Sequence, residues 1–124
     1  MSQIILDMKP VGLNQAYSTN RQGRRFLVAR GKTYKALVGM KAIQSMREFE
    51  GYLGPLKFEY VIEGPWLTKS GSISKTAGDI DGFSKLLCDA VCEALGINDC
   101  TIFEVVGRKV VAGKWRIIAT LYQL

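Results

Sequence analysis

The residue types that could carry out chemistry are concentrated in one short segment of this sequence. Four of the five aspartates lie between residues 79 and 99. The chain contains no histidine, so acid–base or metal chemistry would have to use carboxylates, lysines, tyrosines or thiols. The aspartate-rich segment is therefore the first candidate for a functional site.

The spacing of the charged residues in this segment suits a magnesium site. Asp79 and Asp81 are separated by one residue where a loop is expected to enter a helix. Asp81, Lys85 and Asp89 follow at four-residue intervals, which places them on one helix face. Asp99 comes shortly after the helix is expected to end. Two or three carboxylates suffice for Mg²⁺, which keeps several waters and can activate one for phosphodiester hydrolysis, while a nearby lysine stabilises charge.

The same residues also have purely structural explanations. Asp79 or Asp81 could cap the helix, which is worth about 1 kcal/mol. The Asp81, Lys85 and Asp89 series could be an exposed salt-bridge ladder worth a few tenths of a kcal/mol per pair, at roughly 0.3–0.5. Asp99 could be a turn residue. Spacing alone therefore leaves the function undecided.

The charge distribution favours a polyanionic partner. The chain has 17 Lys and Arg against 11 Asp and Glu, a net charge of +6. From residue 8 to residue 47 there are nine Lys and Arg and no acid. A region of positive charge attracts phosphates through charge pairing and counterion release. The alternative is a basic protein whose charge only keeps it in solution.

Composition excludes several classes of protein. A chain of 124 residues with 48% hydrophobic residues predicts one globular domain over residues 1–124. No apolar run is long enough to span a membrane, and the first residues lack the features of a signal peptide, so a cytoplasmic location is expected. Cys88, Cys92 and Cys100 do not have zinc-ligand spacing and are expected to be reduced and mostly buried.

Hydrophobic periodicity predicts two helices. Residues 29–49 have a helical pattern, and Gly51, Gly54 and Pro55 end it. A second helix begins at Asp79 or Asp81 and runs to residue 95, with Gly96 as its C-cap. Its single apolar face consists of Phe83, Leu86, Leu87, Ala90, Val91, Ala94 and Leu95.

Alternating patterns predict four strands around these helices. They cover residues 3–8, 56–66, 101–106 and 115–122. Residues 9–25 and 67–78 are expected to be loops, and residues 107–114 a basic turn that joins the last two strands into an antiparallel hairpin. The order β-α-β-α-β-β predicts an α+β domain with one mixed β-sheet and two main helices.

The aspartate-rich segment resembles a known family. The pattern D-I-D-G-F-x-K-x-x-x-D-A from residue 79, followed by G-I-N-D-C-T-I from residue 96, is similar to the RusA-type Holliday-junction resolvases. The resemblance implies that Asp79, Asp81 and Asp99 are catalytic carboxylates that bind the metal and that Lys85 is the catalytic lysine. Asp89 corresponds to a further acid on the same helix.

The resemblance spans nearly the whole chain but includes two departures. Pro10, Asn14 and Tyr17, followed by a basic stretch, fit the N-terminal pattern of the family. Family members usually carry two aspartates at the late site, where this chain has Asn98 before Asp99. They often carry asparagine at the position of Gly82. Neither departure removes a predicted metal ligand.

The resemblance implies an activity, a cofactor and partners. The implied protein is a homodimer that binds branched DNA, four-way junctions in particular, and nicks two opposed strands. Its implied cofactor is Mg²⁺, with Mn²⁺ as a substitute, and its implied location is the cytoplasm of a bacterial or phage-infected cell. We expect hydrolysis by metal-activated water without a covalent intermediate and without an organic cofactor. The basic residues expected to contact DNA phosphates are Arg21, Arg24, Arg25, Lys32, Lys69 and Lys75.

Two other functions fit the same residues. A non-catalytic module could bind branched DNA through its basic surface, with the acids acting as caps and ladders. A nuclease for other branched DNA, such as flaps, would have the same carboxylates, because substrate shape is recognised elsewhere on the surface.

Overall fold

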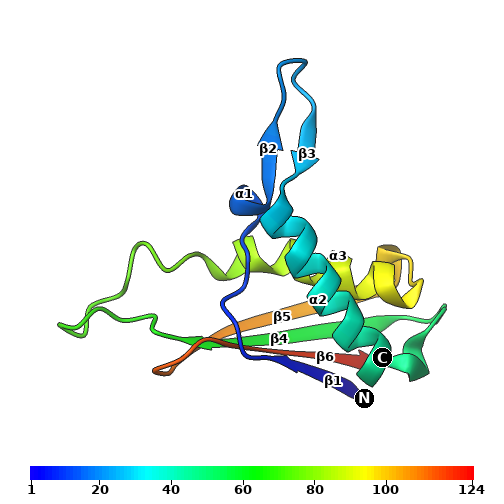
Figure 1. Cartoon of the computed structure of the whole chain (residues 1–124). Coiled ribbons are helices and arrows are strands. Elements are labelled where there is room, and N and C mark those ends of the chain that lie inside the picture. Colours follow the sequence, from blue (N-terminus) through cyan, green and yellow to red (C-terminus); the bar gives the residue numbers. More distant parts are fainter.

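A four-stranded mixed sheet with two long helices on one face forms the body of the protein (Figure 1). The computed structural model describes residues 1–124. The sheet order is β1-β6-β4-β5, with strands β1 (Ser2–Leu6), β4 (Leu56–Gly64), β5 (Ile102–Val111) and β6 (Arg116–Gln123). The helices are α2 (Ala29–Ser45) and α3 (Ile80–Leu95). The predicted mixed sheet with two main helices is confirmed, in a domain of mixed α and β structure that also contains a third, shorter helix.

The core lies between the sheet and the two helices. Every second residue of β4 is buried, as expected for a strand with one face against helices. The predicted apolar face of α3 packs into this core; only Ala94 is half-buried, and Cys92 joins the buried set. Burial of these side chains supplies most of the driving force that holds α3, and hence its charged residues, in place.

The predicted hairpin between the last two strands is wrong. β5 pairs with β4 in parallel, while β6 lies between β1 and β4 and is antiparallel to both. β6 carries buried Ile117, Ala119 and Leu121 and suits a central position. β5 carries Glu104, Arg108 and Lys109 and is at the edge, where charged side chains reach water. The unit β4-α3-β5 is a parallel strand crossover.

The predicted loop at residues 9–25 contains regular structure. A short helix α1 (Leu13–Ala16) is followed by strands β2 (Tyr17–Thr19) and β3 (Arg25–Leu27), which pair as an antiparallel hairpin. This hairpin projects away from the sheet (Figure 1). We call residues 17–27 the arm. The strands are only three residues long, too short for alternation to be visible in the sequence.

The remaining predicted boundaries shift by a few residues. The first helix ends at Ser45 and is followed by a 3₁₀ helix (Arg47–Phe49). The long strand ends at Gly64, before Pro65, which cannot donate to a strand ladder. β5 continues through residues 107–111, which had been expected to form a turn.

The helices and the cysteines bear on two expectations from composition. None of the helices combines the length and apolar character needed to cross a membrane. All three cysteines are free thiols; Cys92 is buried and Cys88 half-buried, as expected for mostly buried thiols, whereas Cys100 is exposed.

Candidate active site

The start of α3 fixes the position of the first two aspartates. Asp79 is the N-cap residue, with extended backbone angles, but its side chain makes no capping hydrogen bond. Gly78 precedes it with φ +114°, a conformation that side-chain-bearing residues rarely adopt. A Cβ on Gly78 would also lie 2.3 Å from the ring of Phe83. Glycine is therefore required where the chain enters α3.

Two side chains from neighbouring strands hold the backbone on both sides of Asp79. The hydroxyl of Tyr60, on β4, donates to the Ile80 carbonyl at 2.8 Å. The ammonium of Lys109, on β5, donates to the Gly78 carbonyl at 2.9 Å and lies 4.3 Å from the ring centroid of Trp66. Sequence reasoning missed both residues, because Tyr60 has the pattern of a core residue and Lys109 was assigned to a turn.

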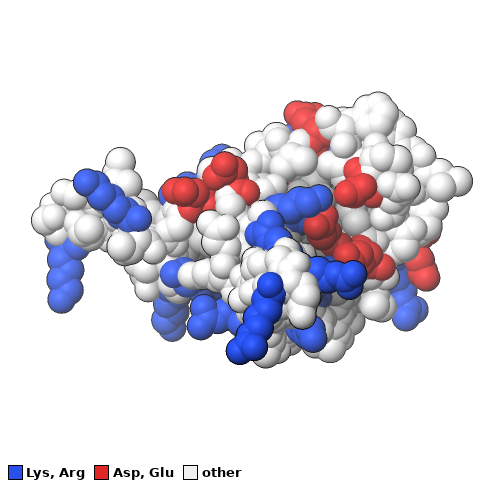
Figure 2. Space-filling model, turned by 90° about the horizontal axis from the view of Figure 1, so that it is seen from above, with Lys and Arg blue, Asp and Glu red and all other residues white.

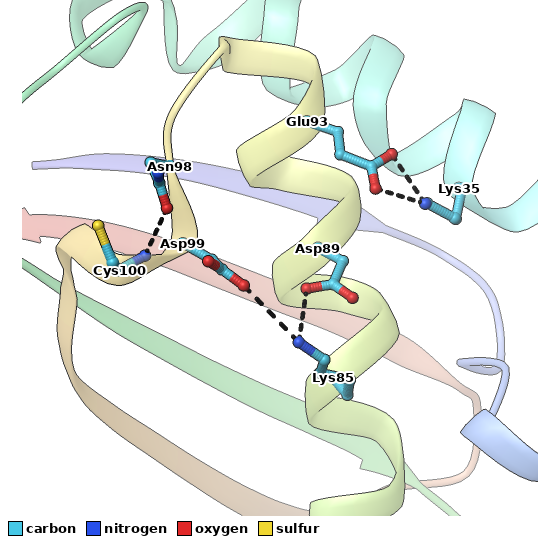
Figure 3. A network of polar contacts seen from close by, with 7 residues as sticks. All are labelled: Lys35, Lys85, Asp89, Glu93, Asn98, Asp99 and Cys100. Carbon is cyan, nitrogen blue, oxygen red and sulfur yellow. Dashed lines mark hydrogen bonds and ion pairs between the residues drawn. The ribbon is translucent and has the colours of Figure 1, made fainter.

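Lys85 lies between two carboxylates (Figure 3). Its Nζ is 3.2 Å from Oδ1 of Asp89 and 3.7 Å from Oδ2 of Asp99. The hydrogen bond and charge of Asp89, with a smaller effect from Asp99, raise the pKa of Lys85. The ammonium form therefore persists throughout the neutral range. Of the ladder predicted from Asp81, Lys85 and Asp89, only the Lys85–Asp89 pair forms, and Asp99 from the next element adds a second contact to Lys85.

A short turn after α3 brings Asp99 to this position. Gly96 ends α3 in the left-handed conformation at φ 65°, and a 3₁₀ helix (Asp99–Thr101) follows. The Asn98 side chain accepts a hydrogen bond from the backbone N–H of Cys100 at 3.0 Å (Figure 3). The Asn98 side chain therefore caps the short 3₁₀ turn in which Asp99 lies.

These residues line one cleft between α3 and β5. The cleft has a volume of about 510 Å³, and Asp81, Lys85, Asp89 and Asp99 form its charged side. Its other lining residues include Tyr60, Ile80, Ile102, Val105 and Gly107. Burial raises the pKa of Tyr60, with a further contribution from Asp81, so its hydroxyl stays protonated at neutral pH and remains a donor.

Asp79 does not line this cleft. It borders a neighbouring cavity of about 200 Å³, together with Lys9, Asn14 and Phe83. Three of the four predicted catalytic residues, Asp81, Lys85 and Asp99, therefore line the same cleft, together with Asp89. Asp79, which Ile80 separates from Asp81 in the sequence, lies outside it. No three acidic or thiol side chains are close enough together in this arrangement to hold a metal ion.

The carboxylates nevertheless have the donor chemistry that magnesium prefers. Asp79 and Asp81 are exposed and make neither a hydrogen bond nor an ion pair, so all four of their oxygens are available. Hard oxygen ligands with room for waters are the usual environment of Mg²⁺. The chemistry of these carboxylate donors therefore fits Mg²⁺.

The predicted DNA-contacting residues lie on three segments of the surface. Arg21, Arg24 and Arg25 are on the arm, and Lys32 lies in the first turns of α2. Lys69 and Lys75 are exposed on the loop between β4 and α3. In the view of Figure 2, Lys and Arg side chains gather beside the acidic residues and along the protruding loop at the left. All six predicted DNA-contacting residues are exposed.

The fold and site together define a small mixed α/β protein with a carboxylate cleft in a basic surface, an arrangement suited to chemistry on a phosphodiester. The sequence matches the family model "Endodeoxyribonuclease RusA" over residues 7–122. The chain therefore belongs to the RusA endodeoxyribonuclease family, whose members act on Holliday junctions. A comparison with curated proteins found no match.

Proposed function

We propose that this protein is a magnesium-dependent endonuclease that resolves four-way DNA junctions by paired symmetric nicks. The observation that carries the proposal is the cleft in which Asp81, Lys85, Asp89 and Asp99 converge, in a chain of an endodeoxyribonuclease family. Carboxylates beside a lysine offer a metal site and a cation to the same phosphate.

In this proposal Asp79, Asp81 and Asp99 hold the metal ion. A bound Mg²⁺ would neutralise charge on the scissile phosphate and favour a nucleophilic water at neutral pH, with Mn²⁺ as a substitute. The hydrogen bonds from Tyr60 and Lys109 to the backbone on either side of Asp79 support the assignment, because they fix the turn that carries Asp79 and Asp81.

Lys85 has two roles in the same proposal. Its ammonium holds Asp89 and Asp99 within the cleft and remains charged at neutral pH. It therefore provides a fixed positive charge where charge builds up on the phosphate in the transition state. Asp89 keeps Lys85 in place through the shorter of the two contacts and is a positioning residue.

The basic residues would bind the DNA backbone around the cleft. The guanidinium of Arg25 lies 4.7 Å from the ring centroid of Tyr17, which stiffens the arm at its base. Arg21 and Arg24 are at the tip, where the Asn20 side chain accepts hydrogen bonds from two backbone N–H groups of the turn. A rigid tip with arginines suits contacts to phosphates.

We also propose that the active form is a homodimer. A four-way junction has approximate two-fold symmetry, so a two-fold dimer would place two identical sites on related strands. Two copies would carry a net charge of about +12, twice the +6 of one chain, which favours binding to a large phosphate surface.

Asp79→Asn tests the proposed metal site. The variant should bind a labelled four-way junction nearly as well as the wild type but lose at least ~100-fold in nicking rate with Mg²⁺, because one ligand is neutralised. Asp7→Asn is the matched control, since Asp7 is an exposed aspartate paired with Arg116, outside the cleft. Nicking by Asp79→Asn at the wild-type rate would remove Asp79 from the site.

Two outcomes with wild-type protein would favour the other functions. Tight junction binding without nicks at any metal or pH would indicate a non-catalytic module. Faster cutting of flaps than of junctions would indicate a nuclease for other branched DNA.

A further inference from the structure

Strand β5 has one unpaired edge along its whole length. It pairs only with β4, and nine of its ten residues are exposed. Several of these are apolar, including Phe103, which is 73% exposed, and Val111, which is 59% exposed. At an edge strand, alternate backbone N–H and C=O groups point away from the sheet without a partner.

Such an edge favours pairing with another strand. Proteins usually protect edge strands by keeping them short, by placing charged side chains on them, or by adding proline or a covering segment. β5 is ten residues long, contains no proline and has no strand or helix at its free side. Its only irregularity is a register shift at its first residues, opposite Leu56 and Lys57. The remaining eight residues form a regular edge.

The side chains of β5 are complementary to a second copy of the same strand. Glu104, Val106 and Arg108 point to the sheet face opposite the helices, since they pair in register with the less buried residues of β4. In an antiparallel pair, directly opposed residues point to the same face. A two-fold axis at Val106 therefore places Glu104 opposite the partner's Arg108, and Arg108 opposite the partner's Glu104.

Other registers lose this complementarity. A shift of two residues in either direction leaves both charges opposite uncharged side chains. A shift of four places either two Glu104 or two Arg108 side chains opposite each other, which destabilises the pair. The register centred on Val106 alone forms both opposite-charge pairs.

We propose that β5 is the dimer interface and pairs with β5 of a second copy, antiparallel and centred on Val106. This proposal rests on the proposed function only for the expectation of a dimer, and the edge itself supplies the surface. The two four-stranded sheets become one continuous sheet of eight strands. Both sets of helices then lie on the same face, because a two-fold axis perpendicular to the sheet preserves its faces.

The pairing places the two clefts beside the axis. Val105 and Gly107, the residues on either side of Val106, line the cleft that holds the charged residues. In the paired sheet the partner's Gly107 lies opposite Val105, so the two clefts open next to each other on one face. Two adjacent and symmetric clefts match the requirement for paired nicks near a junction centre.

A charge exchange between two variants of the full chain tests the register. In a dimer of Glu104→Arg, both cross-strand contacts between positions 104 and 108 join two arginines. In a dimer of Arg108→Glu, both contacts join two glutamates. Each variant alone should dimerise at least tenfold more weakly than the wild type in analytical ultracentrifugation. An equimolar mixture should regain near wild-type affinity as a heterodimer, because each contact then joins opposite charges. Glu50→Arg, an exposed charge outside the sheet, is the control and should dimerise normally.

Val106→Glu provides a second variant, since two carboxylates would meet at the axis while the residue stays exposed in the monomer. Circular dichroism checks that each variant is folded. A wild-type chain that is monomeric at all concentrations, or dimers unaffected by these changes, would overturn the interface. A dimer that depends on β5 but cuts no DNA would support the interface and contradict the proposed function. A dimer that cuts DNA but does not respond to the β5 changes would support the proposed function and contradict the interface.

Discussion

Lys85 is the residue on which the charged side of the cleft depends. Its ammonium contacts two carboxylates that come from different elements, α3 and the following 3₁₀ helix. Without this cation, Asp89 and Asp99 would repel each other, and a phosphate in the cleft would lose a positive neighbour.

Lys85→Met should therefore reduce single-turnover nicking of a junction by ~10²–10³-fold, the usual effect of removing one charge-stabilising group. Lys85→Arg should retain part of the rate, because it keeps the charge with a different shape. Because the pKa of Lys85 is raised above its usual value, its charge is lost only in the strongly alkaline range, and neutral pH changes should not titrate it. A Lys85→Met variant with an unchanged rate would contradict this role.

Gly107 determines whether Tyr60 can hold the start of α3. A Cβ on Gly107 would lie 2.4 Å from the Tyr60 hydroxyl, the group that donates to the Ile80 carbonyl. Gly107→Ala should therefore displace the ring, lower the free energy of unfolding by ~1–3 kcal/mol and slow nicking. Gly113→Ala is the control, since a Cβ there meets no neighbour. Urea denaturation gives the stability. Equal stability of the two variants would show that the Tyr60 contact is not tight.

At the scale of elements, the arm is separate from the catalytic chemistry. Its arginines are exposed, and its strands pair only with each other. The combined change of Arg21 and Arg24 to Gln should weaken junction binding and lower the slope of log K against log salt by ~1–2, close to 0.9 per lost phosphate contact. Thermal stability should stay unchanged. The control is Arg47→Gln, which removes a positive charge beyond the C-terminal end of α2 and should leave the salt slope as in wild type. If Arg47→Gln also weakened junction binding, the loss caused by the arm changes would be due to net charge alone.

Local sequence patterns predicted the features that depend only on residues close together in the chain. The apolar face of α3 and its Gly96 cap follow from residue spacing, and so does the polar face with Asp81, Lys85 and Asp89. The pairing of β5 with β4 could not be found in this way, because strand order depends on competition among all strands for the buried positions. The same holds for Tyr60 and Lys109, whose contacts near Asp79 exist only once β4 and β5 are side by side.

At the scale of the whole molecule, one buried hydroxyl in the core makes stability depend on pH. Tyr34 is 1% exposed, and its hydroxyl has no hydrogen-bond partner. Burial raises the pKa of Tyr34 well above the usual value of 10. Its folded form therefore keeps a proton that the unfolded chain loses, and stability falls as pH rises above ~10.

Tyr34→Phe should remove this contribution. At neutral pH the variant should be as stable as wild type or more stable by ~1 kcal/mol, since an unsatisfied buried hydroxyl costs about 1–3 kcal/mol. Above pH ~10 its free energy of unfolding should fall less steeply. Chemical denaturation at pH 7 and pH 10.5 measures both effects. Parallel pH dependence of the two proteins would mean that the hydroxyl reaches water or a partner.

The cleavage of a synthetic four-way junction by the purified wild-type chain, with and without Mg²⁺, tests the central claim most directly. We predict paired nicks on two opposed strands that require the metal, and much slower cutting of a linear duplex of the same sequence. Intact junctions after long incubation with Mg²⁺ or Mn²⁺, despite measurable junction binding, would contradict the assignment of this cleft as a nuclease site.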